Sequence, residues 1–147
     1  MTEKKILIVD YEPSSLETLS RILKNIKVQV IQATDGAQAY DLFKEEKPDL
    51  VILEAILPKL HGFDLTRKIV QESQGTVPVI ILTGLYKGPQ YKHEAVANLG
   101  AAEYLEKPIN PDVLLEIVSR LLSAEEEIED VLPDPDSVLS LIEPKGK

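Results

Sequence analysis

The sequence predicts an α/β fold in which a parallel sheet is covered by helices on both faces. Five short apolar segments recur along the 147 residues, and each is followed by a stretch whose apolar residues have helical spacing. Three of the apolar segments are continuous and β-branched, which is typical of strands buried on both faces. Strand and helix therefore alternate five times, a pattern that gives parallel strands joined by right-handed crossovers.

The five expected strands differ in how continuous their apolar residues are. Residues 6–9, 50–53 and 79–82 are uninterrupted apolar runs. Residues 28–31 and 102–105 mix polar with apolar side chains, so we expect these two strands at or near the edges of the sheet.

The expected helices begin at recognisable start signals. For four of the five helices these signals lie at Pro13-Ser14, Asp35-Gly36, Gly62 and Asn110-Pro111. In the first helix, an apolar stripe runs from Leu16 to Ile26. The fourth helix, over 89–98, has the weakest pattern, and we expect the fifth to continue into 124–129.

Composition excludes several classes of protein. Without Cys, the chain has no disulfide framework, thiolate metal site or cysteine nucleophile. A net charge of −9 argues against general nucleic-acid binding, which depends on neutralising phosphates. No apolar run approaches the roughly 20 residues of a membrane span, and the N-terminus has no signal-peptide pattern. We expect a cytoplasmic protein that binds neither nucleic acid nor membrane.

The negative charge is concentrated at the C-terminal end. Residues 1–122 carry 17 acidic and 14 basic side chains, whereas residues 123–147 carry 8 acidic and 2 basic ones and three of the ten prolines. We therefore expect one domain over 1–122 and an acidic, proline-containing tail over 123–147. The tail is a linker, a frayed end or, through the apolar patch Val138–Ile142 behind a cap at Asp136-Ser137, a docking helix.

Chemically active side chains follow four of the expected strands. They are Asp10, Tyr11 and Glu12 after the first strand, Glu54 after the third, Thr83 after the fourth, and Lys107 after the fifth. In parallel sheets the ligand crevice lies at the carboxyl ends of the strands, so we expect these groups to converge. Clustered carboxylates favour Mg²⁺, and a hydroxyl and an ammonium can contact phosphoryl oxygens. These are the parts of a phosphoryl-transfer site.

These residues lie in segments that resemble the receiver domain of bacterial two-component response regulators, the CheY-like family. The matching segments are ILIVDYEP at 6–13, DGAQAYDLFKEEKPDLVIL at 35–53, LPKLHGFDL at 57–65, PVIILTG at 78–84 and GAAEYLEKPIN at 100–110. The resemblance covers about residues 4–122. It implies a flavodoxin-like (βα)₅ fold with strand order 2-1-3-4-5 and a part in phosphorelay signal transduction without catalytic turnover.

The resemblance also implies roles for individual residues. An Asp that ends the third strand accepts a phosphoryl group from a histidine kinase in this family, and Glu54 stands at that position. Thr83 and Lys107 stand at the phosphoryl-contact positions, while Asp10, Glu12 and Glu54 are the candidate Mg²⁺ ligands. The bond between Lys107 and Pro108 is a candidate cis peptide.

A partner surface is implied as well. Tyr104 corresponds to the aromatic residue that reports the switch to a surface formed by the fourth helix, fifth strand and fifth helix. Leu99 lies beside that surface. The expected partner is a kinase or a downstream effector, and the same face is a candidate for homodimer formation.

Two departures from the family fall on the chemistry. Glu54 replaces the phospho-accepting Asp, and Tyr11 replaces the second residue of the acidic pair, a direct metal ligand. The extra methylene of Glu54 displaces the nucleophile, and an error of about 1 Å can cost on the order of 100-fold in rate. We therefore expect a pseudo-receiver with impaired or absent phosphorylation and weak or absent Mg²⁺ binding. Whether Glu54 also imitates the phosphorylated state stays open, because removing the Asp need not trigger the switch.

Other readings of the sequence stay open. One is a Mg²⁺-dependent, phospho-accepting receiver with non-standard ligands. A more remote one is a haloacid-dehalogenase-like phosphatase, because Asp10-Tyr11-Glu12 loosely matches the D-x-D pattern of that class. A flavin or nucleotide binder is disfavoured because residues 10–15 contain two carboxylates and no Gly. The two histidines, His61 and His93, are expected to face solvent and to bind no zinc.

Overall fold

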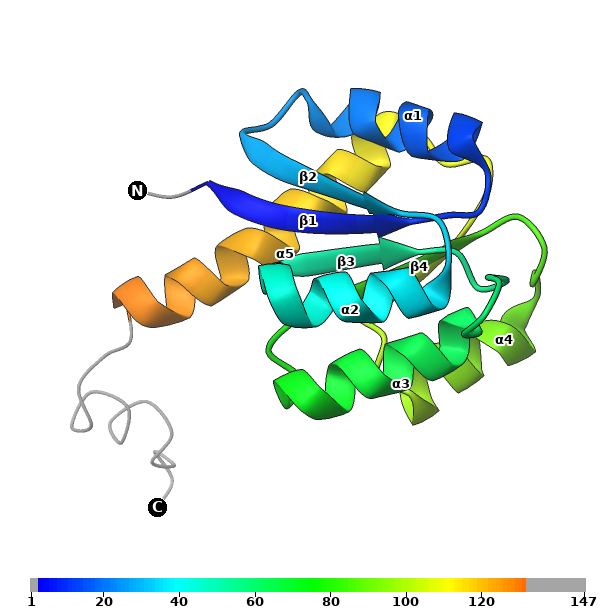
Figure 1. Ribbon diagram of the computed structural model, residues 1–147. Coiled ribbons are helices and arrows are strands. Elements are labelled where there is room, and N and C mark those ends of the chain that lie inside the picture. Colours follow the sequence, from blue (N-terminus) through cyan, green and yellow to red (C-terminus); the bar gives the residue numbers. More distant parts are fainter. Residues whose placement is uncertain (1–2, 132–147) are drawn as a thin grey trace, which may run out of the picture.

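The computed structural model describes the backbone of residues 3–131 and the side chains as far as residue 123. Five strands and five helices alternate along this part of the chain, and the fourth helix ends in a π-helical turn (Figure 1). The strands are β1 (Lys4–Val9), β2 (Val28–Ala33), β3 (Leu50–Leu53), β4 (Val79–Thr83) and β5 (Glu103–Glu106). The helices are α1 (Pro13–Leu23), α2 (Gly36–Glu46), α3 (Gly62–Ser73), α4 (Pro89–His93) with the π-helix η1 (Glu94–Asn98), and α5 (Pro111–Val131).

The strands form one parallel sheet in the order β2-β1-β3-β4-β5, as expected. The three uninterrupted apolar strands are the central ones, and the two strands with mixed patterns lie at the edges. Every residue of β3 and β4 is buried, whereas β2 carries exposed polar residues. The contrast in apolar continuity therefore predicted which strands lie at or near the edges of the sheet and which are buried within it.

Helices cover both faces of the sheet and create two apolar cores (Figure 1). On one face, α1 and α5 pack over the even-numbered side chains of β1 and β3, including Ile8 and Ile52. On the other, α2, α3 and η1 cover alternate side chains such as Val9 and Leu53. The two-residue period of the strands thus sends neighbouring residues into different cores.

Local sequence accounts for most helix boundaries. Pro13 occupies the first turn of α1, and the Asp35 side chain caps α2 by accepting a hydrogen bond from the Gln38 amide at 2.7 Å. The apolar stripe predicted for the first helix is too long, because α1 ends at Leu23 and Ile26 lies in the turn that follows. The expected continuation of the fifth helix into 124–129 is confirmed.

Two positions require glycine because another part of the backbone passes very close to them. No single residue in the sequence signals such an approach. A Cβ on Gly36 would lie 2.0 Å from the Leu60 carbonyl oxygen, and one on Gly62 would lie 2.3 Å from the Glu54 carbonyl oxygen. Gly62 thereby lets α3 begin directly against the end of β3.

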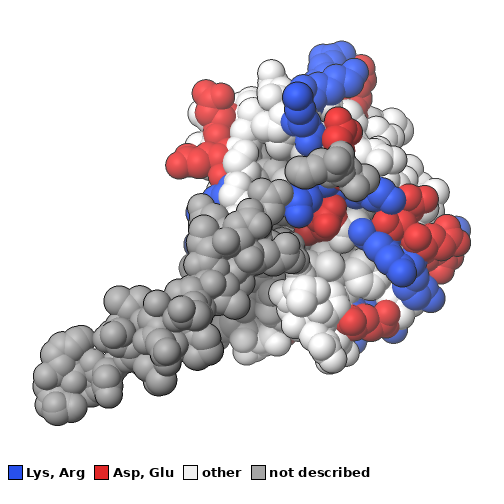
Figure 2. Space-filling view, turned by 90° about the vertical axis from the view of Figure 1, so that its left-hand side faces the viewer, with Lys and Arg blue, Asp and Glu red and all other residues white. Residues whose placement is uncertain are grey.

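Within the part of the chain that the structure describes, no helix is long and apolar enough to cross a membrane. The face at the amino ends of the strands carries acidic and basic side chains next to one another, without a continuous patch of one sign among its coloured residues (Figure 2). The predicted cap at Asp136-Ser137 and patch at Val138–Ile142 lie outside the described residues.

Candidate functional site

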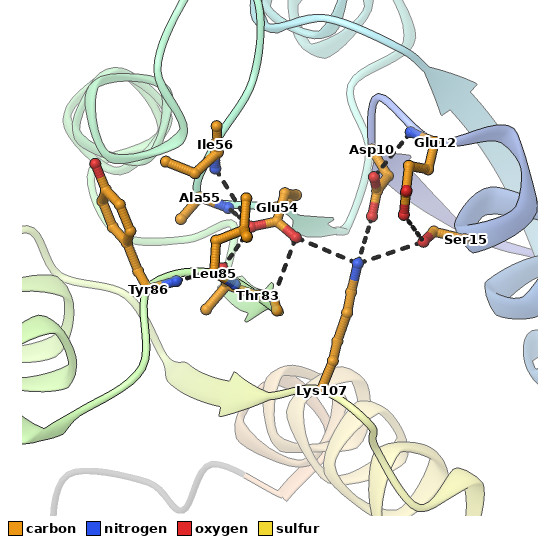
Figure 3. A network of polar contacts seen from close by, with 11 residues as sticks. Asp10, Glu12, Ser15, Glu54, Ala55, Ile56, Thr83, Leu85, Tyr86 and Lys107 are labelled. Carbon is orange, nitrogen blue, oxygen red and sulfur yellow. Dashed lines mark hydrogen bonds and ion pairs between the residues drawn. The ribbon is translucent and has the colours of Figure 1, made fainter.

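The strand order brings the predicted site residues together at the carboxyl ends of β1, β3, β4 and β5 (Figure 3). Asp10 follows β1 and is 2% exposed, and Glu54 follows β3 and is 3% exposed. Thr83 ends β4 and is fully buried, while the Lys107 side chain, just beyond β5, remains 25% exposed. Buried charges are stable only when they are paired or hydrogen-bonded, so their partners decide what the site can do.

Glu54 is surrounded by hydrogen-bond donors (Figure 3). Its Oε2 accepts bonds from the amide of Ala55 at 2.8 Å, from that of Ile56 at 3.3 Å and from the Thr83 hydroxyl at 2.5 Å. Its Oε1 lies 3.4 Å from the amide of Gly84 and 3.2 Å from Lys107 Nζ. Donors from the ends of β3, β4 and β5 and from the segments that follow them therefore converge on one carboxylate, as they would on an anion bound at this place.

Lys107 joins the two buried carboxylates. Its Nζ lies 2.8 Å from Asp10 Oδ2 and 3.2 Å from Glu54 Oε1, and it also donates to the Ser15 hydroxyl at 3.4 Å. Burial by itself lowers the pKa of Lys107, but the hydrogen bond and charge of Asp10 and then the charge of Glu54 raise it, so the net pKa lies above the usual value. Lys107 is therefore an ammonium at neutral pH. Its peptide bond to Pro108 is cis.

The third predicted acid points elsewhere. Glu12 is exposed, and its carboxylate accepts a hydrogen bond from Ser15, while its own amide donates to Asp10 Oδ1 at 3.0 Å. Tyr11 is also exposed, at 41%. The structure thus unites Asp10 and Glu54 around an ammonium and leaves Glu12 at the rim.

The carboxylates of Asp10 and Glu54, as they are arranged, do not fit a Mg²⁺ ion. All four carboxylate oxygens of Asp10 and Glu54 accept bonds from an ammonium, a hydroxyl or backbone amides. Within the described residues, no three or more Asp, Glu, His and Cys side chains are grouped so that they could hold a metal ion. A divalent cation would first have to displace Lys107, because both carboxylates face its Nζ.

The Thr83 hydroxyl connects the site with an aromatic cluster. Its oxygen accepts bonds from the amides of Leu85 at 3.2 Å and Tyr86 at 3.3 Å. The Tyr86 ring stacks on Tyr91 of α4 with centroids 4.6 Å apart, and the Tyr86 carbonyl accepts the Tyr104 hydroxyl at 2.5 Å. Tyr104 is consequently turned inward and is 4% exposed.

Burial governs the chemistry of Tyr104. Burial first, and then the negative charges of Glu106 and Glu54, raise the pKa of its phenol to about 12. Leu99, the other predicted residue of the partner surface, follows η1 and is half-buried.

The prediction that His61 faces solvent is wrong. It is half-buried, its Nδ1 accepts the Phe63 amide at 3.1 Å as the N-cap of α3, and its Nε2 lies 3.4 Å from the Tyr86 hydroxyl. Its place directly before Gly62 at a helix start was the available signal.

Tyr86 was missed too, because nothing in its spacing distinguishes it from an exposed loop residue. His93 is exposed, as expected.

The comparisons with known proteins agree with this arrangement. The family model described as "response regulator receiver domain" matches residues 6–119. The chain belongs to the response regulator receiver family. Such receiver domains are signalling modules of two-component systems, and they typically bind Mg²⁺ at the acidic site.

Individual relatives differ in length. The chain is 32% identical to Protein PilH of Pseudomonas aeruginosa over 81% of its own length and 98% of that protein. It is 40% identical to a probable transcriptional regulator ycf27 of Guillardia theta, over 77% of this chain and 43% of that one. The chain thus spans about half the length of several curated relatives that it matches.

Solved structures share the fold over most of the chain. A CheY-like receiver domain from Methanospirillum hungatei superposes with a TM-score of 0.78 at 28% identity and covers 86% of this chain and 98% of that one. Chemotaxis response regulator CheY4 of Vibrio cholerae gives a TM-score of 0.72 at 31% identity, over 82% of this chain and all of that one. The expected (βα)₅ fold with strand order 2-1-3-4-5 is confirmed.

Proposed function

We propose that this receiver domain acts in two-component signalling through protein contacts, with phosphoryl acceptance impaired or lost, and that Glu54 takes the place of the phosphorylated residue. One observation carries the proposal: the buried Glu54 carboxylate already accepts the hydrogen bond of Thr83 and the ion pair of Lys107. These are the two side chains that contact the phosphoryl group in the family that the sequence resembles.

The position of the carboxylate accounts for the loss of acceptance. A nucleophile must reach phosphorus in line with the leaving group, and an error of about 1 Å can cost on the order of 100-fold. Both Glu54 oxygens are engaged by hydrogen-bond donors, so the carboxylate would have to leave those bonds to attack.

Metal binding is weak or absent for two reasons. Tyr11 adds no charge to the site, and Mg²⁺ competes with Lys107 for Asp10 and Glu54.

The same contacts support the imitation of the phosphorylated state. Glu54 supplies a fixed negative charge to Thr83, and the Thr83 oxygen holds the amides of Leu85 and Tyr86. Tyr86 in turn holds the buried Tyr104. The face formed by α4, β5 and α5, with Leu99 beside it, then meets a kinase, a downstream effector or a second copy of the chain.

In this proposal the chain consists of a receiver-like domain over 1–122 and an acidic tail over 123–147. The helix α5 continues across this boundary to Val131, so the first residues of the tail extend the last helix of the domain. A cytoplasmic location follows from the two-component role.

The proposal is tested by intact-protein mass spectrometry after incubation with acetyl phosphate and Mg²⁺. We expect the natural sequence to gain no phosphoryl group, and the double variant Glu54→Asp with Tyr11→Asp to gain one, because it restores the nucleophile and the metal ligand. Glu54→Asp alone is the matched control and should react more slowly than the double variant. A phosphoryl group on the natural chain, mapped to Glu54, would establish the alternative, a Mg²⁺-dependent receiver with non-standard ligands.

A further inference from the structure

A cavity of about 450 Å³ lies beside the site, between α1 and the segment that joins β5 to α5. Its apolar walls come from Leu19 and Ile22 of α1, Leu82 of β4, and Ile109. Ligand pockets in proteins typically measure about 300–1,000 Å³ and combine apolar walls with a few polar groups. The cavity has the size and the lining of such a pocket.

Charge distinguishes this cavity from the rest of the molecule. Its lining residues, all within the described part of the chain, include two cationic side chains, Lys87 and Lys107, and no carboxylate. The protein as a whole has a net charge of −9. An acidic chain that leaves only lysines at the rim of an apolar cavity favours an anionic occupant over a neutral or cationic one.

The two lysines differ in what they offer to an occupant. Lys107 lies with its Cδ beside Gly84, another lining residue, while its Nζ is engaged by Asp10 and Glu54. Lys87 is exposed, and none of the ion pairs or hydrogen bonds described for residues 3–123 involves it. Lys87 is therefore the cation that can pair with a ligand in the cavity, and Ser15 and Thr18 of α1 also line it.

We propose that this cavity binds a small amphipathic anion: an aromatic or aliphatic body of about two fused rings in size, with a carboxylate, sulfonate or phosphate group facing Lys87. The body would cover Leu19, Ile22 and Ile109 and would touch the stem of Lys107. Because Lys107 bridges Asp10 and Glu54, the occupant adjoins the ion pairs of the phosphoryl site. Binding itself requires neither a phosphoryl donor nor Mg²⁺, so it is independent of whether Glu54 accepts a phosphoryl group.

Two fluorescent probes that differ by one charged group test the proposal. The first is 8-anilinonaphthalene-1-sulfonate, and the second is N-phenyl-1-naphthylamine, which has the same rings without the sulfonate. We expect the sulfonate probe to bind one site with a dissociation constant on the order of tens of micromolar. The neutral probe should bind about fivefold more weakly, because the interaction with an exposed lysine is modest.

Three variants locate the binding. Lys87→Glu should weaken the sulfonate probe about fivefold and leave the neutral probe within about twofold. Lys27→Glu, a change of the same charge at an exposed lysine that does not line the cavity, should leave both probes unchanged. Thr18→Trp places a large ring at the rim from an exposed position and should weaken both probes more than about tenfold, since it fills the apolar space. Far-UV circular dichroism confirms that each variant is folded.

A second measurement fixes the position on the intact chain. In two-dimensional ¹⁵N NMR spectra, the sulfonate probe should shift the amides of Thr18, Gly84 and Ile109, and not those of Lys44 and Thr76 beside a different cavity. Equal binding of both probes, equal weakening by Lys87→Glu and Lys27→Glu, or no effect of Thr18→Trp would each overturn the proposal. None of these results bears on phosphorylation, so the proposal fails independently of the proposed function.

Discussion

Replacing Lys107 by Met should cost about 3 kcal/mol of folding free energy at pH 7. The ammonium makes a 2.8 Å bond to Asp10 and a 3.2 Å contact with Glu54, and these carboxylates are only 2% and 3% exposed. Removing one partner of a buried ion pair typically costs about 3–5 kcal/mol, because the charge that remains is uncompensated. The Lys107 side chain is 25% exposed, which favours the lower end of that range.

The prediction is measured by urea unfolding followed by far-UV circular dichroism, since the chain has no Trp. Lys59→Met is the matched control: Lys59 lies 3.7 Å from Asp35, but its side chain is 69% exposed. Exposed ion pairs of this kind contribute about 0.2–1 kcal/mol and are screened by salt. We expect a loss of about 3 kcal/mol for Lys107→Met that changes little between low and high salt, and a small, salt-sensitive loss for Lys59→Met.

Alkaline pH supplies a second criterion. The pKa of Lys107 is raised in the folded protein, so the stability it contributes is fully present below its unfolded value of about 10.4 and is lost as the pH rises through the folded pKa. The difference in stability between the natural chain and Lys107→Met should therefore be constant at neutral pH and shrink above about pH 10.4. A loss no larger than that of Lys59→Met, or a difference that does not shrink, would show that Lys107 does not hold the site together.

Three further predictions follow from other contacts. Tyr104→Phe should remove the phase with a pKa near 12 from an ultraviolet titration at 295 nm and lower the stability by about 1 kcal/mol through the lost bond to the Tyr86 carbonyl, whereas Tyr11→Phe should leave that phase intact. Gly36→Ala should destabilise the fold by about 3 kcal/mol or more, because its Cβ would meet the Leu60 backbone at 2.0 Å; Gly75→Ala, which meets no atom within 4 Å but has φ +78°, should cost about 1 kcal/mol, and equal losses would contradict the steric argument. Asp35→Ala should lower the stability by about 1 kcal/mol in urea unfolding, and no loss would show that the bond to the Gln38 amide does not cap α2.

The sequence predicted the fold because each strand and helix carries a strong local signal. The central strands are continuous apolar runs, and the edge strands Val28–Ala33 and Glu103–Glu106 mix polar with apolar residues, so the pattern separated edge strands from central ones. Boundaries were harder to predict. Ile26 continues the helical period of the first helix, but α1 ends at Leu23, and the amides of Asn25 and Ile26 bond three residues back in the turn that follows. The π-helical turn of η1 has no counterpart in the period of the sequence.

The candidate site was predictable in its members and less so in its contacts. Asp10, Glu54, Thr83 and Lys107 each follow a strand, and a parallel sheet brings such residues to one edge. Which carboxylates contact the Lys107 ammonium depends on side-chain rotamers, and residue spacing does not reveal these. The sequence therefore grouped Glu12 with Asp10 and Glu54, whereas in the structure the Glu12 carboxylate contacts Ser15. The role of His61 as a helix cap depends on the path of the loop before α3, which a single residue does not reveal.

Lys107 takes part in both the proposed function and the proposed ligand site. Its ammonium neutralises one of the two charges that Asp10 and Glu54 bring into the sheet edge, and its methylene groups form a wall of the apolar cavity. A receiver whose acceptor position already holds an anion gains little from a phosphoryl group, since Thr83 and Lys107 are already engaged. A ligand in the cavity would contact Lys107 without having to displace Glu54. If both proposals hold, an occupant of the cavity would lie against the side chain that bridges Asp10 and Glu54, and it would do so without covalent chemistry.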